Sequence, residues 1–79
     1  MLSQITEAQI VEWLQEAGVE IEISVSEYTT PFNDLGIDSL LMFEMLEVIE
    51  ERTSLTISNV EFKQLITIEA IQAYLNMRL

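Results

Sequence analysis

One serine hydroxyl is the group in this chain best placed for covalent chemistry. It belongs to Ser39, which follows Asp38 and precedes an apolar segment with helical spacing. Asp and Ser are both preferred at the N-cap of a helix, so the pair predicts that a helix begins here. Gly36 lets the preceding loop turn through conformations closed to other residues, and Phe32 and Leu35 can anchor that loop on the core. The pattern predicts an exposed hydroxyl at a helix N-terminus, either as an ordinary cap or as a site of modification.

Most catalytic chemistry lacks its residues in this sequence, which contains no His and no Cys. A nucleophilic serine needs a neighbouring base, and a Ser-His-Asp arrangement is impossible here. Zinc and copper sites normally use His or Cys, and no loop spaces carboxylates like a calcium loop or glycines like a nucleotide loop. The paired carboxylates Glu50 and Glu51 could do acid–base work, but on an exposed helix face they are more typical of a solvated surface. We therefore expect a protein that is not an enzyme and has no metal site.

The chain is strongly acidic. Its 79 residues include three Lys or Arg and 14 Asp or Glu, a net charge of -11. Such a balance argues against nucleic acid and anionic membranes as partners. It favours proteins with basic patches, or serves only to keep the protein soluble. No apolar run approaches the roughly 20 residues that span a bilayer, and residues 1–4 lack the features of a signal peptide. We expect a cytoplasmic monomer.

The N-terminal third predicts one helix followed by a long loop. Thr6 and Gln9 match a capping box, Ile5 and Ile10 stand at the positions of a hydrophobic staple, and Gly18 is placed to end the helix in a left-handed cap. The predicted helix covers residues 7–17.

Residues 19–25 alternate between apolar and polar types as a strand does. A lone strand would leave its backbone groups unpaired, and no second segment alternates this way. We therefore expect an extended loop that lays Val19, Ile21 or Val25 on the core, with Pro31 holding Thr30 extended.

Three further helices are predicted after this loop. The first covers residues 39–52, with Asp38 or Ser39 as its N-cap. Ser58 and Glu61 form a second capping box, which opens a short helix that ends near Leu65. Thr67 is the N-cap of the last helix. In the first of these, one face carries Leu40, Phe43 and Leu46, with Met42 or Ile49, and another carries Glu44, Glu47 and Glu51. The expected fold is all-α: a small four-helix bundle of three longer helices and one short helix, forming a single domain over residues 1–79.

The segment around Ser39 resembles the signature of the acyl carrier protein family. The residues that carry the resemblance are Phe32, Leu35, Gly36, Asp38, Ser39 and Leu40, and the chain length, the long first loop, the short third helix and the closing residues 67–75 also fit. The resemblance implies that Ser39, flanked by Asp38 and Leu40, is modified with 4′-phosphopantetheine from coenzyme A. The thiol of that arm would carry acyl groups as thioesters between enzymes. The implied partners are a phosphopantetheinyl transferase, an acyl-loading enzyme, and a ketosynthase or other condensing or tailoring enzyme.

Two sets of side chains are candidates for the contacts that such a role requires. The first set would recognise partners, or else forms a solvated face and packs on the loop: Leu41, Met42, Glu44, Met45, Glu47, Val48 and Glu51. The second set would line a space for an acyl chain, or else is ordinary core: Phe43, Leu46, Ile57, Phe62, Ile68 and Ile71.

The type of carrier is indicated by the residues next to Ser39. Carriers of fatty acid synthesis tend to have an acidic residue soon after the Ser-Leu pair, where this chain has Leu41 and Met42. Apolar residues there are more similar to polyketide or nonribosomal peptide carriers. Asp38 favours the polyketide type, because peptidyl carriers more often have His at that position. The alternatives are a peptidyl or D-alanyl carrier, or an unmodified acidic interaction module in which Ser39 is only a cap.

The net charge of -11 generates a first prediction. Like charges on a small domain repel one another, and added ions screen that repulsion. Moderate salt or divalent cations should therefore raise the melting temperature, measured by circular dichroism. A melting temperature that responds to neither would show that crowded negative charge does not limit stability.

Overall fold

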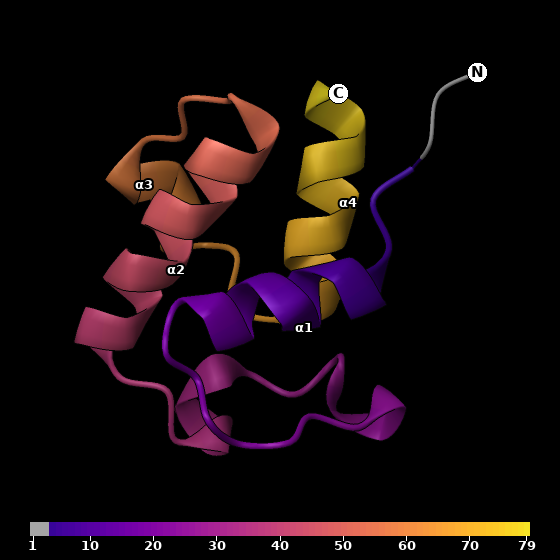
Figure 1. Ribbon diagram of the computed structural model, residues 1–79, viewed down its shortest axis with the longest axis vertical. Coiled ribbons are helices and arrows are strands. Elements are labelled where there is room, and N and C mark those ends of the chain that lie inside the picture. Colours follow the sequence, from indigo (N-terminus) through magenta and orange to yellow (C-terminus); the bar gives the residue numbers. More distant parts are fainter. Residues whose placement is uncertain (1–3) are drawn as a thin grey trace.

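Four α-helices make up the regular structure of the computed structural model, which describes residues 4–79. They are α1 (Glu7–Glu16), α2 (Ser39–Thr53), the single-turn α3 (Asn59–Phe62) and α4 (Ile68–Arg78). Helix α1 packs against both α2 and α4, and in the view of Figure 1 it runs across the lower end of α4. The predicted all-α bundle with three longer helices and one short helix is confirmed. Residues 1–3, where the absence of a signal peptide was inferred, lie outside the described residues.

Both ends of α1 follow the local signals in the sequence. The Thr6 hydroxyl accepts from the Gln9 backbone N–H at 3.2 Å, and the Gln9 side chain accepts from the Thr6 N–H at 3.0 Å, so the predicted capping box is formed. At the other end Gly18 has φ 112°, and the N–H groups of Gly18 and Val19 donate to the carbonyls of Gln15 and Leu14. These two bonds form a Schellman motif. The helix ends at Glu16, one residue before the predicted end.

The segment with strand-like alternation is an extended loop, as predicted. Only one of its predicted core contacts is correct: Val19 is buried, whereas Ile21 and Val25 are exposed, and Ile23 packs against the core instead. At Val25 a 3₁₀ turn, Val25–Glu27, ends the extended segment. The Glu27 carboxylate stabilises this turn by accepting from the Ser24 N–H at 3.0 Å.

A second 3₁₀ turn, Phe32–Leu35, brings the loop back to the core before α2 begins. The Phe32 N–H donates to the Ile66 carbonyl at 2.8 Å, and the Glu69 N–H donates to the Tyr28 carbonyl at 3.0 Å. These two bonds join the long loop to the segment before α4 and to the first turn of α4. Figure 1 shows the loop passing below α1 on its way from α1 to α2.

One apolar cluster holds the helices together, and it contains no buried polar side chain among the residues described. The buried residues of the cluster are Ile5, Ile10, Leu14, Val19, Phe32, Ile37, Met45, Leu46, Ile49, Ile57, Phe62, Ile68, Ile71 and Leu75. Ile5 is fixed by Asn76, whose side chain accepts from the Ile5 N–H at 2.9 Å and donates to its carbonyl at 3.0 Å. No helix within residues 4–79 has the length and apolar character needed to cross a membrane.

The connection between α2 and α3 depends on a carboxylate that was expected to be solvated. Glu50 is half-buried, and its carboxylate accepts from the Ile57 N–H at 2.8 Å, whereas Glu51 is exposed as expected. The second capping box is only half formed: the Ser58 hydroxyl accepts from the Glu61 N–H at 3.1 Å, but the Glu61 carboxylate bonds the Ser58 hydroxyl instead of its backbone. Helix α3 ends at Phe62 rather than near Leu65.

The core predicts a contrast between two deletions of one methylene group. Ile71 is fully buried, whereas Ile21 is 41% exposed. Ile71→Val should lower the free energy of unfolding by about 0.5–1.5 kcal/mol, and Ile21→Val should change it by less than about 0.5 kcal/mol. Urea denaturation followed by circular dichroism measures both. Equal losses in the two variants would contradict the assignment of Ile71 to the core.

Candidate functional site

The start of α2 is capped by Asp38 and not by Ser39. Asp38 has extended backbone angles (φ -88°, ψ 179°), and its carboxylate accepts from the Leu41 N–H at 2.9 Å. The Asp38 carbonyl begins the helical pattern by accepting from the Met42 N–H at 2.9 Å. Since Asp38 performs the capping, the hydroxyl of Ser39 is not needed for it.

Ser39 is the first residue of α2, and it is exposed. Within residues 4–79 its hydroxyl makes no hydrogen bond to another group of the protein. The backbone N–H groups of Ser39 and Leu40 also lack partners there, as expected for the first turn of a helix. The site therefore combines an accessible hydroxyl with unpaired N–H groups at the positive end of a helix dipole.

The loop before Ser39 is held in place by its apolar residues and by one left-handed glycine. Phe32 and Ile37 are buried, and Leu35 is half-buried. Gly36 has φ 81°, which allows the chain to turn out of the 3₁₀ turn, and the Ile37 N–H donates to the Phe32 carbonyl at 3.0 Å. The predicted anchoring by Phe32 and Leu35 is confirmed, and Ile37 is an anchor that the sequence analysis missed.

An open groove of about 590 Å³ lies beside Ser39. It is bounded by the Phe32 turn, the first two turns of α2, helix α3 and the segment before α4. Its apolar lining includes Phe32, Ile37, Met42, Phe43, Leu46, Phe62 and Ile66. Its polar lining is formed by Asn33, Asp38, Ser39, Asn59 and Lys63. The groove therefore offers an apolar surface with amide groups and one cation at its edges.

The residues expected to line an acyl-chain space divide into two groups. Phe43, Leu46 and Phe62 lie in the groove wall. Ile57, Ile68 and Ile71 do not line it, because they are buried in the core with at most 4% of their surface exposed. For these three residues the alternative interpretation, an ordinary core position, matches the structure.

Only part of the apolar surface of α2 is buried. Its buried residues are Met45, Leu46 and Ile49, whereas Leu40 and Phe43 are 68% and 51% exposed. Of the predicted apolar face, Leu46 and Ile49 are therefore in the core while Leu40 and Phe43 are exposed, because the side of α2 that contacts the core follows Met45 and Ile49, four residues apart.

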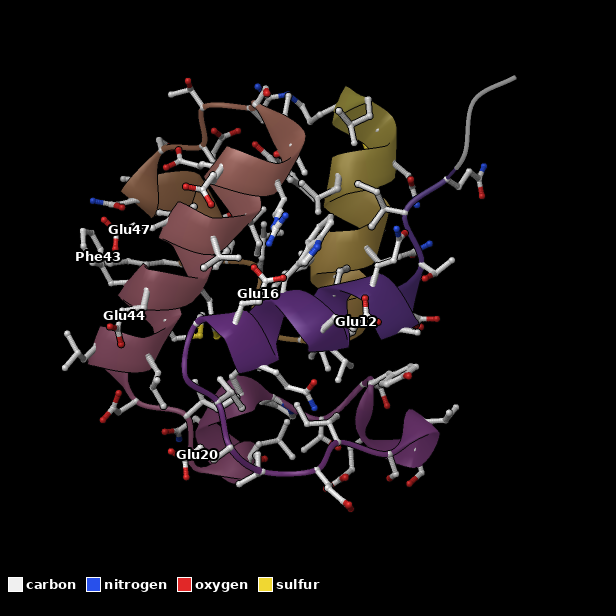
Figure 2. The ribbon with its side chains drawn as sticks, viewed as in Figure 1. Glu12, Glu16, Glu20, Phe43, Glu44 and Glu47 are labelled. Atoms are coloured by element: carbon white, nitrogen blue, oxygen red, sulfur yellow. The ribbon has the colours of Figure 1, made fainter. Side chains whose placement is uncertain are left out.

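The same partial burial of α2 affects the predicted partner contacts. Met45 is fully buried, so it is not a surface residue as expected. Leu41, Met42 and Val48 are half-buried, and Glu44, Glu47 and Glu51 are exposed. Figure 2 shows Phe43, Glu44 and Glu47 together on α2, at the edge of the molecule opposite α4. Two exposed apolar residues outside α2 were not predicted: Ile66, which lines the groove, and Val60 on α3, a helix too short for periodicity to assign its faces.

Positive charge is scarce on this surface, and two of the three cations have partners far from the groove. The Arg52 guanidinium contacts the Glu16 carboxylate at 2.5 Å and thereby joins α2 to α1. The hydrogen bond to Glu16, together with its negative charge, raises the pKa of Arg52 above its ordinary value. Arg78 donates to the Tyr74 hydroxyl and lies over the Tyr74 ring, 5.4 Å from its centre.

The fold and the site define a small helical domain that presents a serine beside an open groove. Residues 10–75 match the family model described as phosphopantetheine attachment site. The match covers most of the chain, which therefore belongs to this family of carrier domains. Comparison with curated proteins and with solved structures gives no significant match.

Membership of this family implies a 4′-phosphopantetheine prosthetic group. The residues of the site fit such a group, because an exposed hydroxyl offers an attachment point, unpaired N–H groups suit a phosphate, and the neighbouring groove has room for a flexible chain. Domains of this kind are generally not catalytic, and they interact with phosphopantetheinyl transferases and biosynthetic enzymes.

The capping geometry at Asp38 generates a prediction about stability. Asp38→Ala removes the bond to the Leu41 N–H and should lower the free energy of unfolding by about 0.5–2 kcal/mol. Asp34→Ala is a matched control, because it removes the same charge from an exposed residue of the neighbouring turn. Urea denaturation of the two variants should separate capping from charge. Similar losses in both would show that the carboxylate of Asp38 does not act as a cap.

Proposed function

We propose that this chain is an acyl carrier protein in which Ser39 carries the phosphopantetheine arm. The observation that supports it most is the division of labour at the start of α2. Asp38 caps the helix, which leaves the Ser39 hydroxyl exposed, without a hydrogen-bond partner among the described residues, and in the wall of a groove. Asp38, Leu40 and Gly36 shape the backbone that presents this hydroxyl.

Attachment is a transfer from coenzyme A to the serine oxygen. Ser39 Oγ forms a bond to the phosphorus nearer the pantetheine, and the bond from that phosphorus to the bridging oxygen of the pyrophosphate breaks. Adenosine 3′,5′-bisphosphate leaves with the electrons of that bond, and a base of the transferase takes the hydroxyl proton. The chain contains no His that could take this proton.

The start of α2 suits the negative charge of the phosphodiester that results. The N–H groups of Ser39 and Leu40 and the helix dipole both favour an anion at this position. When bound, the prosthetic group supplies a thiol that holds an acyl group as a thioester. The protein itself contains no Cys that could compete for the cargo.

The proposed partners dock on α2 and the groove edge. Glu44, Glu47 and Glu51 would face basic patches on the enzymes, while the half-buried Leu41, Met42 and Val48 and the exposed Leu40 and Phe43 supply apolar contacts near Ser39. Apolar residues directly after Ser39 favour polyketide or related fatty-acid-like biosynthesis. Loading trials with acyl, aminoacyl and D-alanyl groups would separate this assignment from a peptidyl or D-alanyl carrier.

The proposal predicts a specific covalent modification. Incubation with coenzyme A and a promiscuous phosphopantetheinyl transferase should add the mass of one phosphopantetheine to the protein, and tandem mass spectrometry should place it on Ser39. Ser39→Ala should abolish the gain, whereas Ser26→Ala, at another exposed serine, should keep it. No gain under conditions that modify a known carrier would instead favour an unmodified acidic interaction module.

A further inference from the structure

Within residues 4–79, one cationic side chain lies in the wall of the groove, that of Lys63. Arg52 is paired with Glu16, and Arg78 is engaged with Tyr74 at the end of α4. Lys63 immediately follows α3, is exposed, and forms no ion pair within residues 4–79. Lys63 and Ser39 line the same groove, although they are far apart in the sequence.

The charge around Ser39 makes this placement significant. The carboxylate of Asp38 is at the adjacent position, and the chain already carries a net charge of -11. A phosphodiester on Ser39 would add another negative charge beside Asp38, and like charges in proximity disfavour each other. A cation that reaches the same groove reduces this repulsion, and an ammonium on a flexible stem can adjust its position to a phosphate.

We propose that Lys63 is the internal counter-ion of the phosphate carried by Ser39. The inference rests on the proposed function, since it requires the modification of Ser39. Pairing with Lys63 holds the base of the prosthetic arm over the groove. The side-chain amides of Asn33 and Asn59 and the apolar surface of Phe62 then lie along the path of an arm that itself contains amide and aliphatic groups.

The test compares apo and fully modified forms of four proteins: the wild type, Lys63→Gln, Lys63→Arg and Arg78→Gln. The last variant is the matched control, because it removes one positive charge at the far end of α4. The measured quantity is the change in melting temperature on modification, determined at low salt. Subtraction of the apo value removes any effect of the substitution on the fold itself.

We expect the change in melting temperature on modification to be lower in Lys63→Gln than in the wild type by roughly 1–6 °C. In Lys63→Arg and Arg78→Gln the change in melting temperature on modification should equal that of the wild type. Moderate salt should reduce the gap between Lys63→Gln and the wild type, because it screens the charge pair. The ³¹P resonance of the modified protein should shift in Lys63→Gln and stay unchanged in Arg78→Gln.

Two outcomes would overturn the assignment of Lys63. An unchanged temperature difference and ³¹P resonance in Lys63→Gln would show that the lysine is merely solvated or is reserved for a partner. An equal effect in Arg78→Gln would show that total charge matters and not pairing at the groove. If the wild type itself gains no mass, the proposed function fails together with this inference, whereas complete modification without any dependence on Lys63 removes this inference alone.

Discussion

The hydrogen bond between the Phe32 N–H and the Ile66 carbonyl is the constraint on which the site depends. At 2.8 Å it joins the loop before α2 to the segment before α4, and the bond from the Glu69 N–H to the Tyr28 carbonyl repeats this connection nearby. Without such bonds, a long surface loop would be mobile relative to the helices. Because the loop is tied at these points and buries Phe32, the first residue of α2 is held at the edge of a groove rather than on a mobile segment.

The small number of cations determines how charge is distributed over the surface. The chain has three Lys or Arg against 14 acidic residues, so the position of each cation strongly affects the local charge. Arg52 joins α1 to α2 through Glu16, Arg78 covers Tyr74, and Lys63 is left at the groove. Between Leu40 and Glu51 the exposed residues of α2 are acidic or apolar, a combination that suits partners offering both positive charge and apolar area.

Where the prediction depended on contacts between near neighbours in the sequence, it was largely correct. The capping box at Thr6, the left-handed cap at Gly18 and the cap residue of α4, Thr67, all form as the sequence indicates. Each involves groups within a few residues, so the chain itself brings them together. The box at Ser58 is incomplete because the Glu61 carboxylate accepts from the Ser58 hydroxyl instead of the Ser58 backbone N–H.

The sequence by itself determined the helices, the extended loop and the serine at the start of α2, because these are set by local hydrogen bonds, backbone sterics and a motif of adjacent residues. Only the tertiary structure decided which side of α2 is covered. Apolar residues surround this helix, and it was packing that buried Met45 and left Phe43 exposed. The groove, and the presence of both Ser39 and Lys63 in its lining, could likewise not be predicted from the sequence, because the groove is formed by segments that are far apart in the chain.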